Sequence, residues 1–229
     1  FRDGSLTYSM GYSVVVTAIF TVLGLIVCTC AAYPLSKKRL KGKIGFTFLL
    51  MFPMYFGAGL IPSYLLFKSL GLLDTMWVLI LPLIYSPYNM LIMKTNLQSS
   101  IPDSLEESAF LDGATNFQIL GHIVLPLSKP VIATLALFYA VGRWNAFADN
   151  QYYILKRHDL KMIQYRLAQM VSSAANAQTE SLSEAAAVTS TPEVLQAAAI
   201  MFTTIPIICI YPFVQKYFTK GVMVGAVKG

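Results

Sequence analysis

The chain has 229 residues, of which 56% are hydrophobic and 12% are charged, and its formal net charge is +6. Soluble domains contain about 25% charged residues, so the composition excludes an ordinary soluble domain and indicates an integral membrane protein. The hydrophobic runs are long and unbroken, which is typical of membrane-spanning helices rather than of strands with alternating polarity. Basic residues cluster beside these runs and are not interleaved with aromatic residues, which favours a role in membrane topology over nucleic-acid binding.

Five hydrophobic stretches are long enough to span a membrane as helices of about 20 residues. They cover residues 10–33, 44–67, 75–97, 126–148 and 194–217. The second, third and fifth stretches contain prolines, which membrane helices tolerate and which bend them. The chain begins with Phe1 rather than Met, so we expect that an N-terminal segment is missing from it.

The positions of Lys and Arg predict which loops face the cytoplasm. They favour a cytoplasmic location for the loop 34–43, for the segment 98–125 and for the C-terminal tail 216–229. The long segment 149–193 and the beginning of the chain are then external. The second part of this external loop is rich in small polar residues, and it is either a flexible loop or a surface that binds an external partner.

The sequence lacks the residue groups that an enzyme of this size would need. Cys28, Cys30 and Cys209 lie in hydrophobic stretches, where we interpret them as packing residues. No His, Asp, Glu or Ser combination has the pattern of a catalytic or metal site, and there is no G-x-x-x-x-G-K-[ST] phosphate loop. The spans contain almost no carboxylates, which argues against an ion-coupled secondary transporter.

The segment 101–125 differs from its hydrophobic neighbours because it is polar and acidic. Pro102 suits the first turn of a helix, and the acids after it favour the positive end of the helix dipole. Phe110, Ala114 and Phe117 occupy positions i, i+4 and i+7, which predicts one apolar stripe on a helix. Leu111 is expected to widen this stripe. Asp112-Gly113 is a turn signal, so we expect two short helices that meet at Gly113.

An acidic amphipathic segment on the cytoplasmic side has two interpretations. In the first, it lies on lipid headgroups, but helices of that kind carry Lys and Arg on their polar face, and residues 101–121 carry none. In the second, it docks onto a protein partner with basic residues, which suits its four acids. We favour docking, because the anionic cytoplasmic leaflet repels an acidic helix.

The spacing within this segment resembles the signature of permease subunits of binding-protein-dependent ABC importers. That signature is Glu-Ala-Ala, three residues, Gly, nine residues, Ile-x-Leu-Pro, and here it reads Glu107-Ser108-Ala109, Gly113 and Ile123-Val124-Leu125-Pro126. Ser108 stands where Ala is usual. Further stretches also resemble this family: residues 32–37, Trp144-Asn145, residues 211–218 and residues 221–229. Residues 221–229 are similar to the tail of the subunit type that includes the maltose importer's smaller permease, and together with residues 211–218 they favour the branch that imports oligosaccharides, including alginate-type polyuronides.

The resemblance implies an all-α fold: a polytopic α-helical membrane protein with the type I ABC importer permease fold, as one transmembrane domain over residues 1–229. Because the family has six helices in this subunit, the five spans here imply a missing N-terminal helix. The resemblance also implies a prokaryotic cytoplasmic (inner) membrane location and an assembly with a second homologous permease, two ATPase subunits and an external solute-binding protein. ATP and Mg would be held by the ATPase subunits, so this chain would bind no cofactor. The substrate would be a carbohydrate or, as the alternative, a non-sugar solute.

Two groups of site residues are predicted. The resemblance implies a coupling helix that docks in a cleft of the ATPase, with Glu107 as its charge anchor: Glu107, Ala109, Phe110, Leu111, Asp112, Gly113, Ala114 and Phe117. Polar or aromatic residues in the spans are candidates for the substrate pathway: Tyr55, Tyr85, Asn89, Tyr139, Arg143, Trp144 and Asn145. Helix packing or an interfacial belt is the alternative role of each aromatic residue. Arg143 either contacts an anionic substrate or extends toward the membrane surface.

Overall fold

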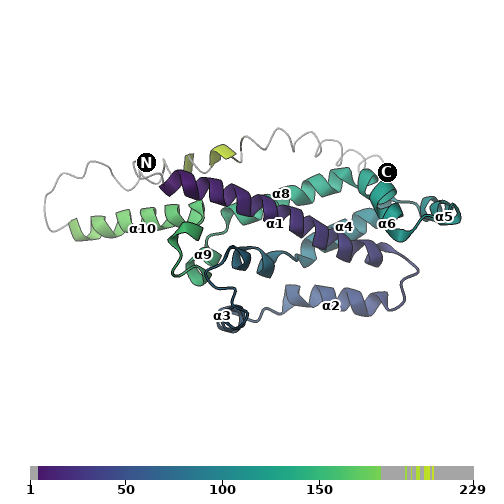
Figure 1. Ribbon diagram of the computed structural model, residues 1–229, viewed down its shortest axis with the longest axis horizontal. Coiled ribbons are helices and arrows are strands. Elements are labelled where there is room, and N and C mark those ends of the chain that lie inside the picture. Colours follow the sequence, from purple (N-terminus) through teal and green to yellow (C-terminus); the bar gives the residue numbers. More distant parts are fainter. Residues whose placement is uncertain are drawn as a thin grey trace. The chain divides into compact units, whose positions relative to one another are not determined.

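The computed structural model describes residues 5–181 and, beyond them, residues 194, 197, 200, 201, 204–206 and 208. This described part consists of helices joined by turns and loops and contains no strand, as expected for an all-α protein (Figure 1). The predicted tail 216–229 lies outside the described residues. So do most of the predicted span 194–217 and residues 182–193 of the predicted external loop.

The first helix, α1, covers Ser5–Ser36 and includes the predicted span 10–33. Its residues Leu6–Ser36 form the one described helix that is long and apolar enough to cross a membrane without a break. The helix begins earlier than predicted because polar residues before the apolar run are also helical. Within the helix, the Ser13 hydroxyl donates to the Ser9 carbonyl oxygen at 2.7 Å, and it also accepts from the Ile163 N–H at 2.8 Å, which ties α1 to a segment distant in sequence.

The second predicted span, 44–67, is broken into two helices, α2 (Lys43–Tyr55) and α3 (Leu60–Ser69). The break contains Gly59, whose φ of 84° lies in the left-handed region that glycine adopts without steric cost. Large apolar side chains are exposed along both helices. An exposed apolar surface of this extent suits contact with lipid or with another membrane subunit rather than with water.

The third predicted span, 75–97, is also divided. Two short 3₁₀ helices, η1 (Met76–Leu79) and η2 (Leu81–Leu83), precede the helix α4 (Pro87–Ser100). Ser86 caps α4 by accepting a hydrogen bond from a first-turn N–H at 3.3 Å. The proline that follows this cap suits the first helical position, where its missing N–H leaves no bond unmade.

Four elements lead from α4 into the next long helix. They are α5 (Asp103–Leu111), α6 (Asn116–Ile119), the π-helical η3 (Leu120–Val124) and α7 (Leu125–Leu127). The long helix is α8 (Lys129–Asn145), which occupies most of the predicted span 126–148. The chain bends by 82° between residues 116–127 and α8. If each bent pair of helices counts as one span, the described residues contain up to four spans.

The predicted external loop is helical over much of its described length. It contains α9 (Ala148–Tyr153), the 3₁₀ turn η4 (His158–Leu160) and α10 (Ile163–Ser181). The interpretation as a flexible loop is therefore wrong for residues 171–181. Several of these residues are alanines, the best helix former, which offsets the turn preference of the serines and asparagine around them.

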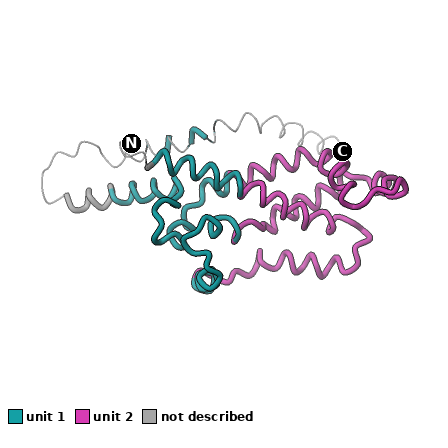
Figure 2. Tube along the Cα trace, in the orientation of Figure 1, with its two compact units in different colours: residues 1–19, 61–81, 141–212 teal, residues 20–60, 82–140, 213–229 magenta. Residues whose placement is uncertain are grey.

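The described helices belong to two compact units, each assembled from separate stretches of the chain (Figure 2). Unit 1 comprises residues 1–19, 61–81 and 141–212, and unit 2 comprises residues 20–60, 82–140 and 213–229. In unit 1, Trp144 packs in a core with Leu6, Ile163 and Leu167. In unit 2, the Tyr85 hydroxyl donates to the carbonyl oxygen of Leu50 on α2 at 2.9 Å. The single transmembrane domain over residues 1–229 stays a prediction.

Within unit 2, Gly24 of α1 lies against the ring of Tyr139 on α8. A Cβ atom on Gly24 would lie 2.8 Å from this ring. Tyr139 has little room to move, because it is 3% exposed and packs edge-on against Phe20 with 5.8 Å between ring centroids. Gly24→Val is therefore expected to destabilise the protein by about 1–3 kcal/mol, the usual effect of overpacking a core. The melting temperature of the purified protein in detergent measures this loss.

Gly11→Val on the same helix is the matched control for Gly24→Val. No atom lies within 4 Å of the Cβ position at Gly11, so only the change in helix propensity is shared by the two variants. Equal melting temperatures for the two variants would contradict the close approach at Gly24.

Candidate functional site

Helix α5 ends in a tight turn at Gly113, whose φ is 83°. The Gly113 N–H donates to the Phe110 carbonyl oxygen at 3.0 Å, and the Ala114 N–H donates to the Ala109 carbonyl oxygen at 2.9 Å. Together these bonds form a Schellman motif, which ends a helix at a left-handed residue and satisfies its last carbonyls. The structure thus confirms the predicted break at Gly113, and the positive φ gives the physical reason for a glycine there.

A capping box begins α6 directly after this turn. The Thr115 hydroxyl accepts from the Gln118 N–H at 3.4 Å, and the Gln118 side-chain oxygen accepts from the Thr115 N–H at 2.8 Å. The sequence signal is Thr-x-x-Gln, which sequence reasoning missed. The two reciprocal bonds fix where α6 starts, so the turn between α5 and α6 is defined on both sides.

This turn separates the apolar residues that were predicted to form a single stripe. The prediction is wrong because Phe110 belongs to α5 and Phe117 to α6, so helical spacing does not relate them. Leu111 and Phe117 are 90% and 86% exposed, whereas Phe110 and Ala114 are half-buried. The most exposed apolar side chains therefore stand on either side of the Gly113 turn.

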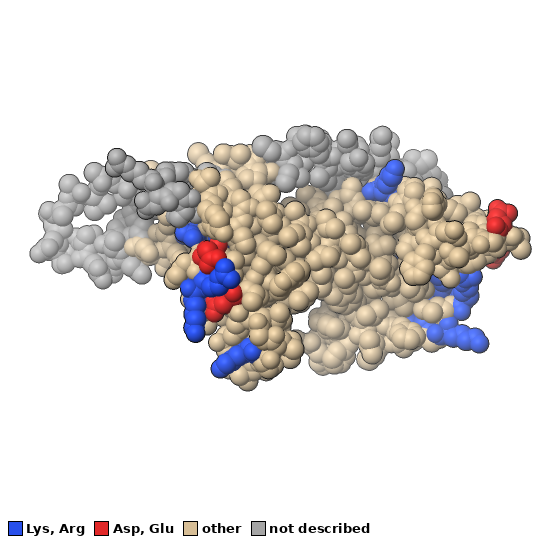
Figure 3. All heavy atoms as spheres, in the orientation of Figure 1, with Lys and Arg blue, Asp and Glu red and all other residues tan. Residues whose placement is uncertain are grey.

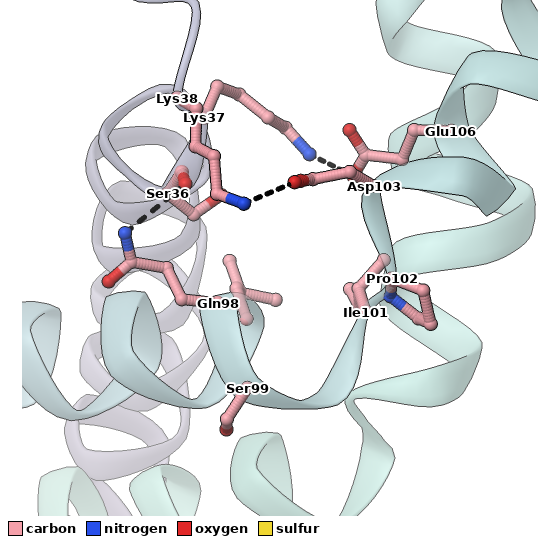
Figure 4. A pocket seen from close by; sticks show the side chains of 10 residues that line it. Ser36, Lys37, Lys38, Gln98, Ser99, Ile101, Pro102, Asp103 and Glu106 are labelled. Carbon is pink, nitrogen blue, oxygen red and sulfur yellow. Dashed lines mark hydrogen bonds and ion pairs between the residues drawn. The ribbon is translucent and has the colours of Figure 1, made fainter.

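The loop after α1 supplies basic partners to two of the four acids of the segment. Lys37 forms an ion pair with the buried Glu106, and Lys38 forms one with Asp103 at 2.7 Å (Figure 4). The hydrogen bond from Lys38 and its positive charge lower the pKa of the Asp103 carboxyl and, conversely, the contact raises the pKa of Lys38. Pro102 lies just before α5 as its N-cap, one position earlier than predicted. Glu106 and Asp103 therefore need no basic partner protein, because their charges are balanced within the chain.

Glu107 and Asp112 are also exposed, but unlike Asp103 neither forms an ion pair or a side-chain hydrogen bond within the described residues. With Leu111 and Phe117 they make up what we call the α5–α6 surface. Charged side chains on the visible face lie in small groups between larger uncharged areas (Figure 3). A pocket of about 720 Å³ adjoins this surface, and Phe117 is one of its lining residues.

Four candidates for the substrate pathway lie in unit 2, in different settings. Tyr55 is the last residue of α2 and is 73% exposed. Tyr85 is half-buried, with its hydroxyl on α2, and Asn89 is buried in α4. Tyr139 is part of the contact with Gly24. The observed packing of Tyr139 matches the alternative role that the sequence left open, and the pathway role of all four residues stays a prediction.

Arg143 lies in unit 1 with a side chain that is 0% exposed. Its guanidinium donates to the Asp149 carboxylate at 2.7 Å and to the Leu79 carbonyl oxygen at 2.8 Å. A second guanidinium nitrogen lies 3.6 Å from the Met162 sulfur. Arg143 therefore joins α8 to η1 and α9, and its role in the substrate pathway stays a prediction. Its neighbours differ in burial, since Trp144 lies in the unit 1 core and Asn145 is exposed.

Asp74 is a structural residue that sequence reasoning missed. It has a φ of 56°, and its carboxylate accepts backbone N–H bonds from Leu155 and Lys156 at 2.8 Å and from Arg157 at 3.3 Å. Burial opposes ionisation, but these three bonds and the charge of Lys156 hold the pKa of the Asp74 carboxyl below its usual range. The contact fixes the turn after α9 to the loop between α3 and η1. No local pattern could reveal it, because 81 residues separate Asp74 from Leu155.

The sequence of this chain matches a known family over most of its length. The model of the family described as "Binding-protein-dependent transport system inner membrane component" matches residues 44–224. The chain belongs to this family. The matched range includes α5, α6 and the whole of α8, so the family assignment covers the α5–α6 surface.

Named members of this permease family are similar over nearly the whole chain. Protein LplC of Bacillus subtilis (strain 168) is 43% identical over 232 residues, covering 100% of this chain and 77% of the relative. YtcP of the same organism, a polygalacturonan/rhamnogalacturonan transport system permease protein, is 43% identical over 222 residues, covering 96% and 77%. The solved structure of a bacterial ABC transporter involved in the import of the acidic polysaccharide alginate aligns with a TM-score of 0.81 and 32% identity, covering 94% of this chain and 76% of that chain.

These similarities confirm three predictions made from the sequence. The fold is that of a type I ABC importer permease, and the protein is an inner-membrane component of a binding-protein-dependent transport system. The relatives are permeases, as expected for a chain without a catalytic constellation. The importer is an ABC transporter of the sugar-permease group.

Proposed function

We propose that this chain is the permease subunit of an ATP-driven importer for an acidic oligosaccharide of the polyuronide type. The observation that carries the proposal is the 43% identity, over 96% of the chain, to a permease named for polygalacturonan and rhamnogalacturonan. The structural relative named for alginate also handles an acidic polysaccharide. Permeases named for neutral arabino- and galacto-oligosaccharides are less similar, at 29% and 31% identity.

The α5–α6 surface suits the docking of an ATPase subunit. Leu111 and Phe117 supply exposed apolar anchors on the two sides of a rigid turn, and Glu107 supplies a charge that no described side chain neutralises by an ion pair. A few apolar anchors with one charged contact are typical of binding hot spots. In this proposal, ATP and Mg are held by two ATPase subunits, and closure of that pair moves the helices of this permease and of a second, homologous one as rigid bodies.

The remaining predicted coupling residues support this surface. Ala109, Phe110 and Ala114 shape the Schellman turn, Gly113 permits it, and Asp112 is exposed at the C-cap of α5. An external solute-binding protein would deliver the oligosaccharide from the other side of the membrane. Among the predicted pathway residues we propose Tyr55 and Asn145, whose side chains are exposed, because the other five are buried or bonded within their own units.

The importer reconstituted with its partner subunits and binding protein tests the substrate class. ATP hydrolysis and uptake are measured with oligogalacturonates and with neutral arabino- and galacto-oligosaccharides. Stronger stimulation by oligogalacturonates supports the proposal. Stimulation by neutral oligosaccharides alone would overturn the acidic class, and a response to none of these sugars would overturn the assignment to sugar import.

Charge reversal at Glu107 tests its role as the anchor on the α5–α6 surface. Glu107→Lys is expected to lower ATP-driven uptake about 30-fold or more, because placing a like charge against a basic partner residue costs several kcal/mol. Uptake into proteoliposomes measures the loss. Lys68→Glu, an exposed charge reversal at the end of α3, is the matched control and should leave uptake unchanged. Normal uptake by Glu107→Lys would remove Glu107 from the proposed contact.

A further inference from the structure

The basic residues after α1 contact α5 near its beginning. The side chains of Lys37 and Glu106 form an ion pair and are only 13% and 10% exposed. The Lys37 ammonium also lies 4.1 Å from the centre of the Tyr33 ring on α1, which holds it from the other side. Lys38 reaches the first residue of α5, Asp103, so two neighbouring lysines bind α5 within its first turn (Figure 4).

The third basic residue, Arg39, contacts the other end of the segment. Its guanidinium donates to the Asn116 side-chain oxygen at 2.9 Å and lies 4.1 Å from the centre of the Phe110 ring. Asn116 is the first residue of α6, and Phe110 is in the last turn of α5. Arg39 therefore bridges both helices across the Gly113 turn, where neither lysine reaches.

These contacts attach the segment to the end of α1 at points that do not lie on one helix face. The Gln98 amide, on α4, adds a hydrogen bond to the Ser36 carbonyl oxygen at 3.3 Å. Contacts at the start of α5, at its end and at the start of α6 leave little freedom to rotate against α1. Among these contacts, the ion pair of Lys37 and Glu106 is expected to stabilise the attachment most, because removing one partner of such a pair leaves the other charge buried and uncompensated.

We infer that Lys37, Lys38 and Arg39 form a basic clamp that positions the α5–α6 surface and transmits its movement to α1. The inference rests on the proposed docking of an ATPase on this surface. Residues 125–130 lead from the same segment into α8, so the clamp provides a second connection, through a helix that is distant in sequence. The positively charged loop thus does more than set the topology of the membrane protein.

Cys30 offers a way to follow α1 without knowing the substrate, because it is exposed, lies two turns before the clamp and is native to the chain. In the complete importer with Cys28 and Cys209 replaced by serine, a membrane-permeant maleimide is allowed to react with Cys30, with and without ATP and vanadate. ATP with vanadate traps the closed ATPase pair, and this trapping is expected to change the rate at which Cys30 reacts with the maleimide. Lys37→Glu is expected to lose this ATP-dependent change while the complex stays assembled and still hydrolyses ATP.

The charge-swapped variant, Lys37→Glu with Glu106→Lys, is expected to recover the ATP-dependent change, since it restores the ion pair with the charges exchanged. Lys41→Glu is the matched control. Lys41 lies in the same loop and forms no ion pair within the described residues, so this variant should show the same ATP-dependent change at Cys30 as the unmodified importer. A purely structural role of the ion pair would instead lower complex yield and ATP hydrolysis together.

Two results would overturn the clamp. One is an ATP-dependent change at Cys30 that persists in Lys37→Glu, and the other is a Cys30 rate that never responds to ATP in the unmodified importer. Failure of the proposed function gives a different result, because the ATPase subunits then do not purify with the unmodified permease, or no sugar stimulates the complex.

Discussion

Replacing Gly113 with proline is expected to abolish ATP-driven uptake while the permease still inserts in the membrane. Proline requires a φ near −65°, whereas Gly113 has a φ of 83°, and proline also lacks the N–H that bonds to the Phe110 carbonyl oxygen. The combined cost is about 3 kcal/mol or more at this one turn. The Schellman ending of α5 is then lost, and Leu111 and Phe117 no longer stand together on the α5–α6 surface.

Alanine substitutions make this test quantitative. Gly113→Ala keeps the backbone N–H, but its Cβ atom makes the left-handed conformation less stable by about 1–2 kcal/mol. We therefore expect only a partial loss of uptake. Gly121→Ala is the control, because Gly121 has no positive φ and no atom within 4 Å of its Cβ position. Full uptake by Gly113→Pro would show that the turn is not needed for coupling.

Removing the Arg143 side chain is expected to destabilise unit 1 by about 3 kcal/mol, the lower end of the cost of breaking a buried ion pair, because the Asp149 side chain that loses its partner is 21% exposed. Arg143→Ala leaves the Asp149 carboxylate without its partner and the Leu79 carbonyl oxygen without a donor. A lower melting temperature of the purified complex measures the loss. Arg143→Met combined with Asp149→Leu should lose less, since apolar side chains replace such pairs at small cost.

Arg166→Ala serves as the control for Arg143. Arg166 is half-buried and forms no ion pair within the described residues, and its hydrogen bond to the His158 carbonyl oxygen at 2.9 Å is exposed, so its loss should cost only about 1 kcal/mol. If Arg143→Ala kept the melting temperature and lost the response to acidic oligosaccharides, Arg143 would be a substrate residue and its structural role would be wrong.

The local features of the α5–α6 segment could be predicted from the sequence, whereas its tertiary contacts could not. Asp112-Gly113 predicted the turn correctly because one left-handed residue there determines the helix ending. The apolar stripe was wrong because helical spacing does not continue through that turn. The pair of Lys37 and Glu106 has no sequence signal, since 69 residues separate the partners and a basic loop beside a span is fully explained by topology.

For the predicted membrane spans, too, the sequence indicated general features but not the exact breaks or the tertiary contacts. The prolines and glycines of residues 44–67 indicated bending, but propensity alone did not place the break at residues 56–59. Arg143 was singled out as a costly charge within a span, but the sequence analysis missed its partner Asp149, which lies only six residues along the chain. The helix over 163–181 was missed because its small polar residues are common in loops as well as in helices.

Photo-crosslinking from the α5–α6 surface tests most directly whether this permease is driven by an ATPase docked there. A photoreactive amino acid replaces Leu111 or Phe117 in the assembled importer, and Leu70, exposed at the end of α3, is the control position. Crosslinks from positions 111 and 117 to the ATPase subunit, with none from position 70, are the predicted result. An intact, ATP-hydrolysing complex in which neither position crosslinks to the ATPase would contradict it.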